Sequence, residues 1–204
     1  MESQKSHWEN VFATKTPNQV SWTQQYPKTS IDYLRKLHLP KTANIIDVGG
    51  GDSKFVDALL EEGYENIWVL DISELALERA KQRLGANAEV VHWVVSDIVD
   101  FKPEVQFNFW HDRAAFHFLI DDKSIATYVA TIENTIVKGG NFLLGTFSEN
   151  GPVKCSGLEI RQYSEATMKK TFDNKFEALE CFRENHQTPF DTVQSFQFCG
   201  FKKK

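Results

Sequence analysis

The sequence contains no apolar run long enough to cross a membrane. A membrane-spanning helix needs about 18 or more consecutive apolar residues, and no stretch of the chain approaches that length. The opening residues also lack the apolar core of a signal peptide. We therefore expect a soluble, cytoplasmic protein with no membrane partner.

Cysteine is scarce, and positive charge is not in excess. Three cysteines, Cys155, Cys181 and Cys199, occur among 204 residues, and none belongs to a Cys-x-x-Cys motif. This odd number argues against a disulfide framework and a zinc knuckle, so we expect reduced thiols and no metal site. The 23 basic and 28 acidic residues give a formal net charge of −5. Such a chain offers no broad positive field to a nucleic-acid partner.

What the chain does contain is an alternation of short apolar runs with segments of helical periodicity. The runs predict five strands, at residues 44–48, 67–70, 89–95, 107–110 and 141–147. Helices are predicted at about residues 53–60, 73–84, 123–136 and 164–171, with Asp52 or Ser53 capping the first. Repeated β-α-β units of this length indicate an α/β fold with a doubly wound, mostly parallel sheet and helices on both faces.

The two ends of the chain differ from this pattern. Residues 176–184 and 193–201 are strand-like, and about eight residues join them, too few for a parallel crossover. They should form an antiparallel hairpin at one edge of the sheet, with His186 in its turn. Residues 1–40 contain no good strand and are punctuated by prolines. We expect them to be a helical cap or lid, followed by one globular unit over residues 41–204.

Acidic residues stand where four of the predicted strands end, at Asp47, Asp71, Asp97 and Asp112. Two residues after the first of them, Asp47, a glycine run begins, made of Gly49, Gly50 and Gly51. Glycines let the backbone turn tightly and approach a ligand. Because ligands of open α/β sheets bind beyond the carboxyl ends of the strands, these residues mark the candidate site.

The glycine run completes neither of two common nucleotide motifs. Lys54 occupies the third glycine position of Gly-x-Gly-x-x-Gly, and the phosphate-loop pattern is absent. The carboxylate of Asp47 would repel a pyrophosphate but suits a cationic ligand, whereas Asp71 can accept hydrogen bonds from both ribose hydroxyls. The pattern favours a nucleoside with a cationic tail, although Asp71 or Asp97 taken singly could be a helix cap.

The ordered acids, the glycine run and the terminal hairpin resemble those of class I S-adenosylmethionine-dependent methyltransferases, the seven-stranded, Rossmann-like type, over about residues 41–204. By that resemblance the cofactor is S-adenosyl-L-methionine. The resemblance places the methionine part at Asp47, Gly49, Gly50 and Gly51, the ribose at Asp71, the adenine at Ile72, Asp97 and Ile98, and the sulfonium beside Trp110 and His111. Ile72 could also be ordinary core.

Residues 110–119 carry the most unusual local chemistry. They resemble a stretch of thiopurine methyltransferase-like and some protein-lysine methyltransferase-like enzymes, with alanines in place of a glycine and its neighbour. The candidates for a general base, or for orienting the acceptor, are His111, Asp112 and His117. In the alternative interpretation, Asp112 and Arg113 form a charge pair that holds the loop, and His117 is a satisfied core histidine.

Candidates for contacting the substrate or forming a lid are Trp22, Tyr26 and Arg113. Aromatic faces suit a sulfonium or an adenine, and core packing is the alternative for the two aromatic residues. Cys155 does not follow a proline, which argues against a covalent pyrimidine nucleophile.

The expected activity is methyl transfer by in-line displacement to a small molecule. Aromatic residues near the expected methyl site would build an enclosed, mostly apolar pocket, and a holding role suffices where the donor is already activated. A protein lysine is the alternative acceptor, because an acidic surface could recruit a basic segment. A methyltransferase-like binding partner without activity is the second alternative. The oligomeric state is not indicated.

Overall fold

A seven-stranded sheet forms the centre of the structure, which is a computed structural model describing residues 4–204. The strands lie in the order β3-β2-β1-β4-β5-β9-β8. Their bounds are β1 Asn44–Val48, β2 Asn66–Asp71, β3 Val91–Val95, β4 Phe107–Arg113, β5 Ile136–Phe147, β8 Phe176–Gln187 and β9 Val193–Lys203. Neighbours among β1 to β5 are parallel, and β9 runs antiparallel to β5 and β8. The predicted, mostly parallel sheet with a C-terminal hairpin at its edge is confirmed.

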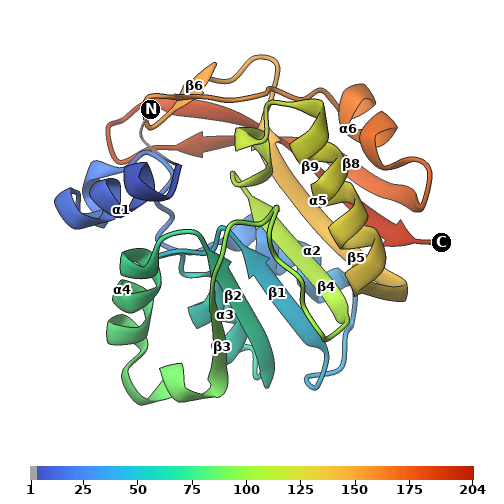
Figure 1. Cartoon of the computed structure of the whole chain (residues 1–204), viewed down its shortest axis with the longest axis horizontal. Coiled ribbons are helices and arrows are strands. Elements are labelled where there is room, and N and C mark those ends of the chain that lie inside the picture. The colour runs from blue at the N-terminus through green and yellow to red at the C-terminus, as the bar shows by residue number, and fades with distance from the viewer. Residues whose placement is uncertain (1–3) are drawn as a thin grey trace.

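Helices cover both faces of this sheet. Their bounds are α1 Gln4–Thr14, α2 Lys28–Lys36, α3 Phe55–Glu61, α4 Glu74–Leu84, α5 Asp122–Thr135 and α6 Glu165–Phe172. Short 3-10 turns lie at Pro17–Gln19, Gly85–Val90 and Phe116–Phe118, and a two-stranded ribbon pairs β6 Lys154–Cys155 with β7 Leu158–Glu159. Figure 1 shows α5 on one face of the sheet and α2 and α3 on the other, with α1 beyond the carboxyl ends of β1 and β2.

Two buried clusters fill the space between the sheet and these helices. One contains Trp110 of β4 and Tyr128 of α5, and the other contains Phe109 of β4 with Ile31 of α2 and Phe55 of α3. Successive side chains of a strand point to opposite faces, so β4 contributes to both clusters. The same alternation decides which of its C-terminal residues can reach a given ligand.

Local signals set most element ends. The hydroxyl of Ser73 accepts from the N–H of Ala76 at the start of α4, and Gly85, with φ of 57°, ends that helix, as expected. The predicted cap of α3 is wrong, because Lys54 occupies that position and the helix begins at Phe55. The third strand begins at Val91 rather than at residue 89, since the preceding residues form a 3-10 turn.

The expectation of reduced thiols is wrong for two of the three cysteines. Cys181 and Cys199 lie opposite each other on β8 and β9, with Cα atoms 4.1 Å apart, and form a disulfide. Cys155 is free and buried. His186 lies in β8 and not in the hairpin turn, and its Nε2 is 2.8 Å from the carbonyl oxygen of Ser21.

The N-terminal segment, as far as the structure describes it from residue 4, contains helices and no strand. Its division from residues 41–204 as a separate cap stays a prediction. Among the described residues, no helix is long and apolar enough to cross a membrane.

Candidate active site

Two adjoining cavities open beyond the carboxyl ends of β1, β2 and β4. The first encloses about 120 Å³ and the second about 560 Å³. The residues that line both are Phe12, Trp22, Gly49 and Arg113. The predicted acids at the ends of the first three strands are divided between them, with Asp71 and Asp97 in the first and Asp47 in the second.

Asp47 presents one carboxylate oxygen to the protein and leaves the other unused. Its Oδ1 is 2.6 Å from Nδ1 of His111, while Oδ2 is buried and has no partner. The other ring nitrogen of His111, Nε2, is 2.8 Å from the hydroxyl of Ser30, and the ring lies 4.0 Å from that of Phe55. The histidine thus fixes the orientation of Asp47, whose free oxygen suits a positively charged donor.

The glycine run leaves no room for side chains. A Cβ on Gly49 would lie 2.5 Å from the Cβ of Ala115, and the φ of Gly49 is 65°. A Cβ on Gly51 would lie 2.9 Å from Oδ2 of Asp71. Both positions therefore require glycine, because a side chain would clash with the walls of the site and because positive φ disfavours other residues.

Asp71 lies at the end of β2, and its carboxylate already accepts a hydrogen bond from the backbone. Its Oδ1 accepts from the N–H of Ser73 at 2.8 Å. Burial raises the pKa of Asp71 to about 7, and the nearby carboxylates of Asp47 and Glu9 act in the same direction. A ligand that donates hydrogen bonds here, as a diol does, would compensate for that burial.

Residues after β3 complete the first cavity. Ile98 and Asp97 line it together with Ile72 and Ser96. One oxygen of Asp97, Oδ1, accepts from the N–H of Val99 at 3.1 Å. Two branched apolar side chains beside a carboxylate suit a flat base that carries an amine.

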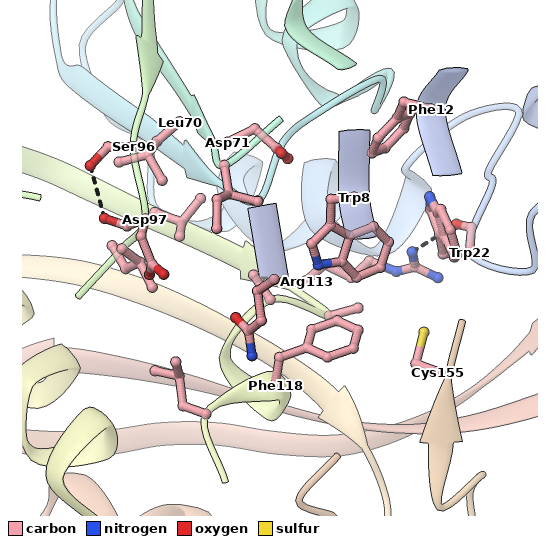
Figure 2. A pocket seen from close by; sticks show the side chains of 18 residues that line it. Trp8, Phe12, Trp22, Leu70, Asp71, Ser96, Asp97, Arg113, Phe118 and Cys155 are labelled. Carbon is pink, nitrogen blue, oxygen red and sulfur yellow. Dashed lines mark hydrogen bonds between the residues drawn. The ribbon is translucent and has the colours of Figure 1, made fainter. Parts of the chain in front are cut away.

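Aromatic side chains of α1 border the opposite side of the first cavity. Trp8 and Phe12 line the first cavity, and the Trp8 ring lies 5.1 Å from that of Phe118 and 5.6 Å from that of Trp22. Figure 2 shows Trp8, Phe12 and Trp22 together on the side away from Ser96 and Asp97. Tyr26 is 43% exposed and lines neither cavity, so of the two predicted lid residues Trp22 alone reaches the site.

Glu9 connects α1 to the start of α4 through hydrogen bonds. Its carboxylate accepts from the hydroxyl of Ser73 at 2.9 Å and from the N–H of Glu74 at 2.8 Å, at the start of α4. Neither Trp8 nor Glu9 was identified from the sequence. The spacing of Trp8 and Phe12, four residues apart, is the signal that could have indicated an aromatic helix face.

Besides Tyr26, three predicted site residues line neither cavity. Trp110 is fully buried and donates from its indole to the hydroxyl of Tyr128. Asp112 accepts from that hydroxyl at 2.7 Å and from the N–H groups of Ala115 and Phe116, and burial raises its pKa to about 6. His117, also fully buried, has its pKa lowered to about 3 by burial and by the nearby Arg113.

The charge pair considered for Asp112 and Arg113 is not formed. As neighbours in β4, they point to opposite faces of the sheet, Asp112 toward α5 and Arg113 into the site. Nδ1 of His117 accepts from the N–H of Phe147 at 3.3 Å. The other ring nitrogen of His117, Nε2, is buried and has no partner, so this histidine is only partly satisfied. The role of Asp112 and His117 in catalysis stays a prediction.

Comparison with known proteins agrees with this geometry. A family model described as "Methyltransferase domain" matches residues 45–140, from β1 into β5. Residues 45–140 therefore form a methyltransferase domain, and the whole chain shares the fold of S-adenosylmethionine-dependent methyltransferases.

A curated relative has a methyltransferase name. The chain is 23% identical over 144 residues to the eEF1A lysine and N-terminal methyltransferase of Mus musculus, and the match covers 67% of this chain and 20% of that protein. The chain thus spans about a fifth of the length of that relative.

Two solved structures share the fold. The N-methyltransferase NodS from Bradyrhizobium japonicum, in complex with S-adenosyl-L-homocysteine, has a TM-score of 0.71 at 14% identity and covers 98% of this chain and 99% of its own. The 1,6-didemethyltoxoflavin-N1-methyltransferase of Burkholderia thailandensis has a TM-score of 0.69 at 18% identity, and the match covers 96% of this chain and 81% of that chain.

The residues present in this chain fit S-adenosylmethionine. The unpartnered Oδ2 of Asp47 suits the ammonium group of its methionine part, and the glycine run admits the chain beside it. Asp71 suits the ribose, and Asp97 the adenine amine. No group of three or more metal-binding side chains was found in residues 4–204.

Proposed function

We propose that this protein is an S-adenosylmethionine-dependent methyltransferase that transfers a methyl group to a small-molecule acceptor. The observation that carries the proposal is the apolar part of the first cavity, beside Phe118 and Leu119, which the aromatic rings of α1 border. When bound, S-adenosylmethionine supplies a methyl group on a positively charged sulfur, which an acceptor lone pair takes by in-line displacement to leave S-adenosylhomocysteine.

The protein's part is to bind, orient and exclude water. Asp47, Asp71 and Asp97 bind the cofactor at three separate points. Binding at three points fixes the position of the sulfur and its methyl group. Trp8 and Trp22 keep water from the site, and their aromatic faces tolerate a positive charge. Holding two reactants in contact and in line removes much of the entropic part of the barrier.

The walls beyond Gly49 offer no ready general base. They are formed by Ala114, Ala115, Phe118, Leu119 and Cys155. Burial raises the pKa of Cys155 to about 12, so this thiol stays protonated at neutral pH. An acceptor that is already nucleophilic, such as a neutral amine or a thiolate, is therefore favoured over one that must lose a proton to the enzyme.

A protein lysine is the second candidate acceptor. The similarity to the eEF1A lysine and N-terminal methyltransferase favours it, as does the net charge of −5, which could attract a basic segment. The aromatic rings of α1 beside the first cavity argue for the small molecule, because a lysine on a folded protein needs an open mouth.

The test uses S-adenosylmethionine labelled in its methyl group, with cell extract separated by size. We expect label in the small-molecule fraction with the wild type and with Glu104→Ala, an exposed control, and none with Asp71→Ala. Label only in the protein fraction, lost when one target lysine is replaced, would refute the small-molecule acceptor.

A further inference from the structure

Arg113 lies where the two cavities meet, at the end of β4. Its side chain extends over β5, where its partner in register is Gly145, and its Cζ lies 4.5 Å from the ring centre of Phe196 on β9. Arg113 lines the first cavity beside apolar side chains, and it also lines the second cavity, which contains Asp47 and the glycine run. The guanidinium is therefore within reach of both the acceptor side and the methionine side of the site.

The hydrogen bonds of this guanidinium are incomplete. Nη1 donates to the carbonyl oxygen of Trp22 at 3.0 Å, the bond drawn in Figure 2. Nε and Nη2 are shielded from solvent and have no partner. These two nitrogens carry the parallel N–H bonds that match the two oxygens of a carboxylate. Contact with Phe196 covers a face of the guanidinium and leaves that edge open.

The protein does not supply an anion to this fork. Burial lowers the pKa of Arg113 to about 10, against the opposite effects of Glu184, Cys155 and Asp47, so the group is still a cation at neutral pH. Yet Nε and Nη2 bond to neither carboxylate, and Oε2 of Glu184 is itself buried without a partner. Two solvent-shielded N–H groups on a cation, without a partner in the protein, suit an anion from outside the chain.

We propose that the methyl acceptor carries a carboxylate, which the Nε and Nη2 groups of Arg113 bind. The inference rests on the proposed function and names its substrate class. The adjoining wall residues, Ala114, Phe118 and Leu119, are apolar and do not direct a polar group. The bond between the acceptor's carboxylate and Arg113 would therefore set the orientation of the acceptor. The cofactor's own carboxylate is the other source of the same chemistry, and the experiments separate the two.

The first experiment measures binding of benzoate and of its neutral isostere benzamide to the full chain saturated with S-adenosylhomocysteine. We expect benzoate to bind at least about tenfold more tightly than benzamide, and this preference to disappear in Arg113→Met. Arg113→Lys, which keeps the charge but loses the fork, should fall between. Glu184→Gln, the matched control, should keep or strengthen benzoate binding.

The outcomes decide between the two carboxylates. Affinity for S-adenosylhomocysteine should change little in Arg113→Met. If that affinity falls by about tenfold or more while benzoate binding persists, the fork belongs to the cofactor and the proposal is wrong. Equal affinity of the wild type for benzoate and benzamide, including no binding of either, also refutes it, and this comparison needs no variant to fold.

The second experiment divides the small-molecule extract on an anion-exchange resin before labelling. Label in the retained, anionic pool supports the proposal. Label in the unretained pool refutes the carboxylate while the proposed function stands. Label in neither pool, with label in protein, refutes the small-molecule function itself.

Discussion

The raised pKa of Asp71 makes cofactor binding depend on pH in a defined direction. Its ordinary value of 3.8 rises to about 7 in the ligand-free site because the carboxylate is buried. The ionised form is the one that accepts hydrogen bonds from two hydroxyls, so binding requires loss of this proton as pH falls below about 7. Near pH 5.5 about 3% of the group is ionised, which predicts affinity about 30-fold lower than at pH 8, or about 2 kcal/mol.

Folding stability should respond in the opposite sense. Because the folded pKa of Asp71 lies above its unfolded value, the stability that this group contributes is complete below about pH 4 and is lost as pH rises through about 7. Because S-adenosylhomocysteine should bind more tightly at pH 8, it should raise the melting temperature more at pH 8 than at pH 5.5.

Calorimetric titration with S-adenosylhomocysteine across this pH range checks the reasoning. We expect Asp71→Asn to bind more weakly at pH 8 and to lose the pH dependence. Asp112, whose pKa is about 6, titrates in the same range but lines neither cavity. If the slope persists unchanged in Asp71→Asn, another group causes it and Asp71 does not hold the ribose as a carboxylate.

Three further variants test the walls and the frame of the site. Gly49→Ala should remove measurable binding of S-adenosylhomocysteine in calorimetry, because its Cβ would lie 2.5 Å from that of Ala115; normal binding would show that the turn can adapt. Trp8→Ala should weaken that ligand by about 1 kcal/mol or more and speed its release in stopped-flow fluorescence, and an unchanged rate would mean that α1 is not a lid. Cys181→Ser should lower the free energy of unfolding in urea by about 3 kcal/mol, the chain-entropy value for the 18-residue separation, and a reductant should do the same to the wild type but not to the variant.

Features that depend on neighbouring residues were accessible from the sequence. Asp47, Asp71 and Asp97 each follow a short apolar run, and a parallel sheet brings the ends of such runs to one edge. The hairpin was equally accessible, because the short connection between its strands excludes a crossover. The cofactor side of the site follows from these two observations.

Features that depend on register were not accessible. Asp112 ends an apolar run just as Asp47 does, but β4 continues to Arg113, and alternation turns Asp112 toward α5. The disulfide arises because the register of the hairpin places Cys181 opposite Cys199. Neither fact can be read from spacing.

The lid depends on a contact between distant segments. Trp8 and Phe12 are visible in the sequence as aromatic residues on one helix face, but nothing local says what that face covers. The answer comes from Glu9, which binds the start of α4, 64 residues away at Ser73. Long-range contacts of this kind are what the structure adds to the sequence.

Calorimetry with two ligands tests the central claim most directly. S-adenosylhomocysteine and NAD both contain an adenosine, but only the first has an ammonium group for the free oxygen of Asp47 and lacks a pyrophosphate for it to repel. We predict that the wild type binds S-adenosylhomocysteine with one site per chain and does not bind NAD. Binding of NAD without binding of S-adenosylhomocysteine would contradict the assignment of this site.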